Sequence, residues 1–275
     1  MGPHRARLRA LAYRMLGSAS DADDVLQEAW LRLQRAGEIA DRGAWLTTAV
    51  TRLSLDRLRL ERNRREEYIG PWLPEPVATA PEEVDPETIS FAFLCLLERL
   101  SPTERAVFLL HRVFELGHAE IAEALGMSHA AVRQVHHRAQ EHIAAERPRF
   151  APSKEDHAAL LARFAAACGS GDLLALRALL TANAGVHTDG GGKARAALKV
   201  VQGAEESARF ILGLVKKGRL DGLQIEVRDL NGWPALVGIG SDDACVIALE
   251  TDGVHIQNVY VVVNPEKLRA IRQPS

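Results

Sequence analysis

Cysteine is scarce in this sequence, and long hydrophobic runs are missing. Three cysteines occur among 275 residues, at Cys95, Cys168 and Cys245, and their spacing contains no CxxC pair. An odd number of distant cysteines argues against a disulfide framework and a zinc site, and it suits a reducing compartment. No apolar run approaches the roughly 20 residues of a membrane helix, and no signal-peptide cleavage pattern follows the first residues. We therefore expect a cytoplasmic protein without a membrane partner.

Lysine is absent from residues 1–150, which hold 20 arginines against 22 acidic residues. The formal net charge of −2 hides a local imbalance. Between Arg42 and Arg65, seven arginines face two acidic residues, a local charge of +5. Such a patch can contact phosphates whatever the rest of the protein carries, although a solvated helix face has the same composition.

The order of patterns predicts a multi-domain chain. Helical periodicity covers 5–65, a proline-rich acidic stretch covers 66–90, and helical periodicity then returns as far as about residue 147. In the helix that follows Gly43, Trp45, Leu46, Ala49, Leu53 and Leu60 fall on one predicted side, and Arg52, Asp56 and Arg59 on another. The expected segments are a helical domain (1–66), a linker (67–90), a second helical domain (91–148) and a C-terminal domain (153–275).

The C-terminal segment changes in kind. Helices are expected at about 154–168, 172–182 and 204–217. Four runs of alternating polarity follow them: "LQIEVRDL", "PALVGIG", "ACVIALE" and "VHIQNVYVVV". The turn signals "NGW", "SDD" and "TDG" separate these runs, which predicts an antiparallel meander. Helices followed by a meander indicate an α+β domain with the helices packed on one sheet face.

The stretch "HAEIAEALGMSHAAVRQVHHRA" has the pattern of a helix-turn-helix. Ala122 is small where two helices cross, Gly126 supplies the turn, Ser128 can cap the second helix, and Val132 and Val135 face inward. An ordinary helical hairpin shares the apolar spacing but does not need the glycine and the cap together. The residues expected to contact DNA are Ser128, His129, Arg133, Gln134, His137 and Arg138.

Several motifs in this order resemble one family. "DADDVLQEAWLRL", "AWLTTAVTRLSLDRLR" and "LSPTERAVFLLHRVFELGHAEIAEALGMSHAAVRQVHHRA" resemble an extracytoplasmic-function (ECF) sigma factor of bacterial RNA polymerase. "YIGPWLPEP", "DGGGK" and "NPEKL" resemble the SigJ-like subgroup, whose extension is a SnoaL-like domain of the NTF2 superfamily. The resemblance implies two all-α sigma domains, region 2 and the region 4 helix-turn-helix, plus an α+β SnoaL/NTF2-like cone. One departure is His136, where a small apolar residue is expected.

The resemblance also implies partners. Region 2 would bind the β′ clamp helices of core RNA polymerase, and region 4 would lie near the β flap and bind the minus-35 element of promoter DNA. The implied polymerase-binding residues are Asp24, Gln27, Glu28 and Leu31. The implied minus-10 residues are Arg52, Asp56, Arg57 and Arg59.

An exposed tryptophan on a linker usually has a packing partner. We hypothesise that the linker docks on the C-terminal domain, with Glu75 pairing with Lys193 or Lys267; the alternative is that Trp72 packs on its own first domain. The regulatory contact would comprise Trp72, Leu73, Pro74, Glu75, Asp189, Lys193, Asn264, Pro265, Lys267 and Leu268.

Enzyme chemistry is not expected. The acid–base candidates in the C-terminal domain are His187, Asp189, Asp221 and His255, isolated positions that predict no catalytic site, cofactor or metal. The sequence leaves open whether an NTF2-like pocket binds a small-molecule ligand. The alternative function is a ligand-responsive repressor, but a repressor has no need of the arginine-rich helix or of "DADDVLQEAWLRL". A third reading, an enzyme fused to a DNA-binding module, requires turnover by residues 153–275.

Overall fold

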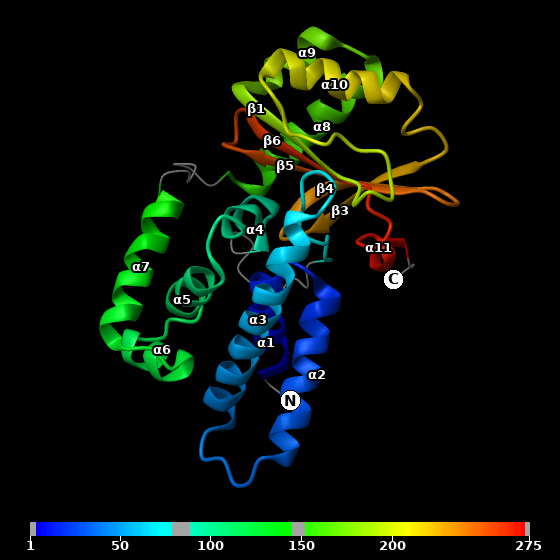
Figure 1. Cartoon of the computed structure of the whole chain (residues 1–275). Helices are drawn as coiled ribbons and strands as arrows, with labels where there is room; N and C mark the ends of the chain where they lie inside the picture. Colours follow the sequence, from blue (N-terminus) through cyan, green and yellow to red (C-terminus); the bar gives the residue numbers. More distant parts are fainter. Residues whose placement is uncertain (1–3, 79–88, 145–151, 273–275) are drawn as a thin grey trace. The chain divides into compact units, whose positions relative to one another are not determined.

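A computed structural model describes residues 4–78, 89–144 and 152–272 (Figure 1). The described chain forms two compact units. The first comprises 4–67, 89 and 93–144, and the second comprises 68–78, 90–92 and 152–272. The linker prolines Pro81 and Pro86 lie outside the described residues. No helix in the described ranges combines the length and apolarity that a membrane crossing requires.

The first unit is helical. Its elements are α1 (Arg5–Leu16), α2 (Ala19–Arg35), α3 (Arg42–Glu66), α4 (Phe91–Leu97) from residue 93 onward, α5 (Pro102–Arg112), α6 (His118–Leu125) and α7 (His129–Ala144). Side-chain caps define two of the starts. Ser18 accepts from the Asp21 amide to begin α2, and a Ser101–Glu104 capping box begins α5. Gly126, with a φ of 65°, ends α6 in the left-handed conformation that turns the chain into α7.

Buried Arg105 joins the two halves of this unit. Its guanidinium donates to the Met15 carbonyl at the end of α1 (2.7 Å) and to the Leu97 carbonyl at the end of α4 (2.9 Å). It also pairs with Glu98 at 2.7 Å. Carbonyls at helix C-termini carry partial negative charge, so these groups together compensate a buried cation.

The predicted inward face of α3 is partly wrong. Leu46 is buried, but Leu60 is 75% exposed, and Val50, Leu55 and Leu58 form the buried side instead. The α3 sequence alternates Leu and Arg closely, so two helical faces carry leucine, and packing against α1 and α2 selects between them.

The second unit is a mixed sheet with helices packed on it. Its helices are α8 (Lys154–Ser170), α9 (Leu173–Leu179), α10 (Ala204–Lys216) and α11 (Arg269–Arg272). Its strands are β1 (Leu180–Asp189), β2 (Val201–Gln202), β3 (Gln224–Leu230), β4 (Trp233–Ile239), β5 (Ala244–Thr251) and β6 (Ile256–Val262). The sheet order is β2-β1-β6-β5-β4-β3. In Figure 1, α8, α9 and α10 lie together over one face of the sheet, and Phe164, Leu176 and Val186 belong to the core between them.

The meander prediction is confirmed, because β3 to β6 pair antiparallel in sequence order. The sequence did not predict β1, and the helix expected at 172–182 ends at Leu179. β1 pairs in parallel with β6, a partner about 70 residues away, with an irregularity between Leu180 and Gly185. At Gly185 a Cβ would lie 2.6 Å from Asn258 Oδ1, so glycine permits the close approach.

Candidate functional site

The end of β1 holds the linker through one buried carboxylate. Asp189 is 0% exposed. Its Oδ1 accepts from the Tyr68 hydroxyl at 2.6 Å, and its Oδ2 accepts from the Leu73 amide at 2.8 Å and from Lys267 Nζ at 2.6 Å. With Asn264, which donates to the Tyr68 oxygen at 2.9 Å, these residues form what we call the linker clamp: Tyr68, Leu73, Asp189, Asn264 and Lys267.

Lys267 is the cation of the clamp. Its ammonium also donates to the Leu73 carbonyl, and it lies 4.1 Å from the centroid of the Trp72 ring. Charge-assisted hydrogen bonds and a cation–π contact compensate desolvation of both charges. Burial, the hydrogen bond to Asp189 and its negative charge raise the pKa of Tyr68 above its ordinary value, so the phenol keeps the proton it donates.

The glycine-rich turn lets the linker come close. Gly191 and Gly192 have φ values of 57° and 72°, in the left-handed region that favours glycine. A Cβ on Gly191 would lie 2.3 Å from Asn264 Nδ2, and one on Gly192 would lie 2.8 Å from Ile69 Cδ1. "DGGGK" is therefore a structural turn against which the linker packs.

A second contact holds the linker farther along. Two hydrogen bonds join Val77 and Asn231. The backbone N–H of Val77 donates to Asn231 Oδ1 (3.0 Å), and the backbone N–H of Asn231 donates to the Val77 carbonyl (2.9 Å). Ala78 forms an antiparallel bridge with Leu230. Between the two contacts, Leu73, Pro74 and Pro76 are buried, and prolines favour such an extended path.

The structure brings most of the predicted linker residues together with their expected surface. Asp189, Asn264, Lys267 and Leu268 are buried or half-buried there, whereas Pro265 is exposed. Lys193 pairs with Glu266, and Lys267 pairs with Asp189, so each lysine named for Glu75 has a different carboxylate beside it. Tyr68 and Asn231 were not predicted from the sequence to take part in this contact. Tyr68 is the first residue of "YIGPWLPEP", and its place in that motif is the sequence signal that could have identified it.

The predicted polymerase-binding residues form a stripe on α2. Asp24, Gln27, Glu28 and Leu31 are exposed at helical spacing, and the apolar Leu31 is 39% exposed. Glu28 pairs with Arg32 at 2.8 Å.

The predicted minus-10 residues lie on α3. Arg52, Asp56 and Arg59 are exposed, and Arg57 is half-buried among Asp21, Asp24 and Glu61. Arg52 Nε donates to the Ala124 carbonyl at 2.7 Å, at the C-terminus of α6. In this conformation Arg52 therefore contacts the helix-turn-helix.

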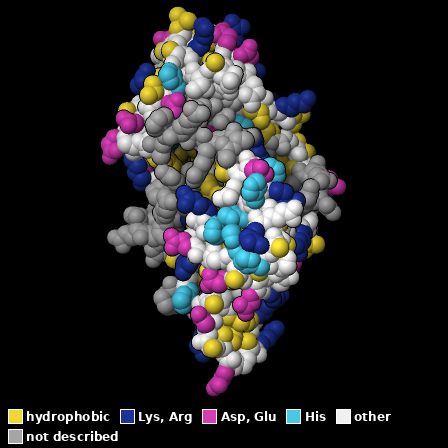
Figure 2. Space-filling view, turned by 90° about the vertical axis from the view of Figure 1, so that its left-hand side faces the viewer, with side chains coloured by type: hydrophobic (Ala, Val, Ile, Leu, Met, Phe, Trp, Pro, Cys, Tyr) yellow, Lys and Arg dark blue, Asp and Glu magenta, His cyan; other side chains and the backbone are white. Residues whose placement is uncertain are grey.

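The predicted minus-35 residues are all exposed on α6–α7, as a reading helix requires. Ser128 Oγ accepts from the Ala131 amide at 3.1 Å, which caps α7, and Val132 and Val135 are buried behind it. Figure 2 faces the side on which Figure 1 draws α6 and α7, and it shows histidine side chains gathered beside basic side chains. Two of these residues have acidic neighbours: Arg138 Nε lies 4.0 Å from Glu104 Oε1, and His137 Nδ1 lies 3.3 Å from Glu141 Oε2.

The four acid–base candidates of the second unit have separate surroundings. His187 Nε2 lies 3.1 Å from Asn258 Oδ1, and Asp189 holds the linker. Asp221 and His255 are exposed. Asp189 is thus occupied structurally, as a hydrogen-bond acceptor for the linker.

Comparison with known proteins follows the same division. The family model for sigma-70 region 2 matches residues 1–64, and that for sigma-70 region 4 matches residues 90–143. The chain is 43% identical over 223 residues to the ECF RNA polymerase sigma factor SigJ of Mycobacterium tuberculosis, covering 78% of this chain and 71% of that protein. It is 32% identical over 281 residues to the probable ECF RNA polymerase sigma factor SigI of the same species, covering 98% and 93%.

The crystal structure of M. tuberculosis SigJ superposes with a TM-score of 0.78 at 35% identity, covering 96% of this chain and 95% of that one. The predicted fold class is confirmed for the helical region 2 and region 4 domains and for the α+β C-terminal unit. These matches favour a sigma factor over the repressor alternative. The chain belongs to the ECF sigma factors of RNA polymerase, which direct transcription initiation at selected promoters.

Proposed function

We propose that the C-terminal unit regulates this sigma factor by holding its linker in a fixed path. The observation that carries the proposal is the buried Asp189 carboxylate, which accepts hydrogen bonds from two linker groups and from Lys267. A buried carboxylate needs such partners, and the linker supplies two of them. Docking and the burial of the carboxylate are therefore coupled.

The proposed partners are core RNA polymerase and promoter DNA. The exposed α2 stripe of Asp24, Gln27, Glu28 and Leu31 binds core enzyme. The α3 face around Arg52 and Asp56 binds the minus-10 element, where a cationic surface suits a single strand. The exposed α7 face binds the minus-35 element in the major groove. A cytoplasmic location and the lack of catalytic activity follow from this role.

The linker clamp then sets the separation of the two promoter-reading regions. A docked linker restricts the distances that region 2 and region 4 can adopt, and a released linker samples many. Promoters of one spacer length therefore suit the clamped protein, and the clamp acts as a selector of spacing.

Run-off transcription with core polymerase tests this role. The templates carry spacers of graded length between the two elements. Full-length protein is compared with Asp189→Asn, with a truncation near residue 152 and with a truncation just before Asn264. Lys193→Met is the matched control, because Lys193 is an exposed neighbour outside the clamp.

We expect a sharp optimum of spacer length for the full-length protein and for Lys193→Met. Asp189→Asn and both truncations should transcribe the optimal template less and discriminate less between spacers. Unchanged transcription together with unchanged protease sensitivity of the linker in Asp189→Asn and in Trp72→Ala would exclude a regulatory role for the clamp.

A further inference from the structure

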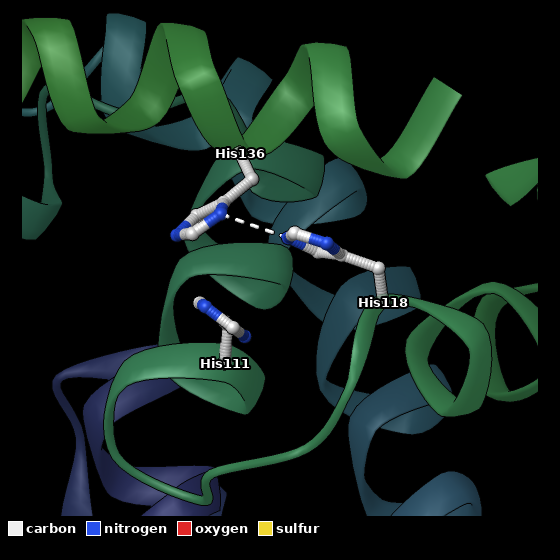
Figure 3. Close-up of side chains that lie close together, drawn as sticks. All are labelled: His111, His118 and His136. Atoms are coloured by element: carbon white, nitrogen blue, oxygen red, sulfur yellow. Dashed lines mark hydrogen bonds between the residues drawn. The ribbon is translucent and has the colours of Figure 1, made fainter. Parts of the chain in front are cut away.

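Three histidines meet where α5 packs against the helix-turn-helix. His111 comes from the end of α5, His118 from the start of α6 and His136 from the middle of α7 (Figure 3). One ring nitrogen of each lies within 4.8 Å of the others. The pairs are close: ring centroids of His111 and His136 are 4.2 Å apart, and those of His111 and His118 are 4.7 Å apart. His136 is 7% exposed and the other two are half-buried.

We propose that these three imidazoles form a binding site for a divalent late transition metal, with Zn²⁺ the best match. Three histidines are a known ligand set for zinc, with solvent in the fourth position. Imidazole also suits Cu²⁺ and Ni²⁺, and the Irving–Williams order sets their relative affinities. The proposal is independent of the role assigned to the linker clamp.

The spacing of the nitrogens fits this ligand set. Two nitrogens bound to one tetrahedral zinc at about 2.0–2.1 Å lie roughly 3.3 Å apart. His118 Nε2 and His136 Nδ1 are 3.0 Å apart, joined by one hydrogen bond. When a metal enters, the shared proton moves to the ring nitrogen that faces away, and the His111 ring moves inward by up to about 1.5 Å.

A backbone carbonyl orients the His111 ring. Its Nδ1 lies 2.9 Å from the Leu116 carbonyl, which accepts the Nδ1 proton. A backbone carbonyl at one ring nitrogen fixes the tautomer and leaves the lone pair of Nε2 available as a ligand.

Electrostatics agrees with the geometry. Burial, then the neighbouring His111 and His118, lower the pKa of His136 to about 4. Burial, then His111, His129 and Arg133, lower the pKa of His118. These surroundings favour the neutral imidazole, which is the form that binds metal.

A bound ion would cross-link α5, α6 and α7, the helices that position the minus-35 face. The ordinary alternative is a neutral histidine cluster that only packs. The family resemblance leads us to expect a small apolar residue at the position of His136, so packing of the two helices does not by itself call for three imidazoles in contact.

Titration of the full-length protein with Zn²⁺, and with Co²⁺ as a spectroscopic probe, tests the site. His111→Gln, His118→Gln and His136→Gln are compared with His137→Gln and His142→Gln, exposed histidines of α7 outside the cluster. We expect one equivalent bound with the visible bands of tetrahedral Co²⁺, and a melting temperature that rises with Zn²⁺ concentration. Each cluster variant should lose more metal affinity than the roughly 10- to 100-fold that is typical when a group hydrogen-bonded to a metal ligand is changed. Both controls should bind metal like the wild type.

Equal affinity in all five variants would mean adventitious surface binding only and would overturn the proposal, as would the absence of tetrahedral Co²⁺ bands in the wild type. The half-buried His111 and His118 keep the test valid if the buried His136→Gln variant fails to fold. Circular dichroism of each metal-free variant separates loss of a ligand from loss of structure.

Discussion

Replacing Lys267 with methionine should release the linker. The substitution keeps the length of the side chain but removes the cation from the buried Asp189 carboxylate, 2.6 Å away. Breaking a buried ion pair by removing one partner costs about 3–5 kcal/mol, because the other charge stays buried without compensation. At about 1.4 kcal/mol per tenfold, the population with an open linker should rise by about 100-fold to several thousand-fold. Undocking lets Asp189 regain water, so the linker is the element expected to respond.

Hydrogen exchange at the Leu73 amide measures this opening directly. That amide donates to Asp189 Oδ2 at 2.8 Å in a buried setting, so it exchanges only when the linker leaves. Mass spectrometry of a peptide spanning 68–78 should show exchange of Leu73 faster by about 100-fold or more in Lys267→Met.

Lys193→Met is the matched control, because it removes a neighbouring lysine whose ion pair with Glu266 is exposed. A surface pair contributes about 0–1 kcal/mol, so exchange should change by less than about tenfold. If Lys267→Met stays folded and its Leu73 amide exchanges as slowly as in the wild type, the clamp does not hold the linker.

Three further predictions concern the second unit. Gly191→Ala should also raise the exchange rate of the Leu73 amide, because a φ of 57° disfavours alanine and the added Cβ would lie 2.3 Å from Asn264 Nδ2. The control Gly169→Ala adds a Cβ in open space and should leave that rate unchanged. Burial raises the pKa of Cys168 to about 12 and also raises the pKa of Cys245. At pH 8, iodoacetamide should therefore modify these two thiols far more slowly than the partly exposed Cys95. Peptide mapping measures the three rates, and equal rates would contradict this prediction. Burial lowers the pKa of His157, while the Pro234 carbonyl and Asp229 oppose the shift. The stabilising contribution of neutral His157 is therefore complete above the unfolded pKa of about 6.5 and is lost as pH falls below it. His157→Gln should flatten the thermal stability profile of the second unit below about pH 6.5, and an identical acid dependence would contradict the assignment.

Local signals in the sequence predicted much of the fold. Ser18 and Ser101 act as caps, Gly126 makes the helix-turn-helix turn, and the alternation in β3 to β6 produces a meander. These features depend on neighbouring residues, so a short window of sequence contains them. β1 was missed because its strongest partner, β6, is distant in the chain and its own polarity does not alternate cleanly.

The candidate sites show the same division. The linker motif, the glycine turn and "NPEKL" pointed to one surface, but the prediction that Glu75 pairs with Lys193 or Lys267 did not identify Asp189 as a partner of Lys267. Asp189 meets it because β1 ends beside the residue that follows β6, a result of the parallel pairing. The histidine cluster joins three helices, and only His136, out of place in its helix, hinted at it in the sequence.

Capture by core RNA polymerase tests the family assignment and the proposed faces most directly. Purified core enzyme is mixed with the full-length chain at modest ionic strength and passed over a sizing column, beside a Leu31→Arg/Glu28→Arg variant that reverses the α2 stripe. The wild-type chain should coelute with core enzyme and support promoter-dependent transcripts, while the variant should elute alone with its helical content intact. Failure of the wild-type chain to bind core enzyme, or undiminished binding of the folded variant, would contradict the polymerase-binding face proposed here.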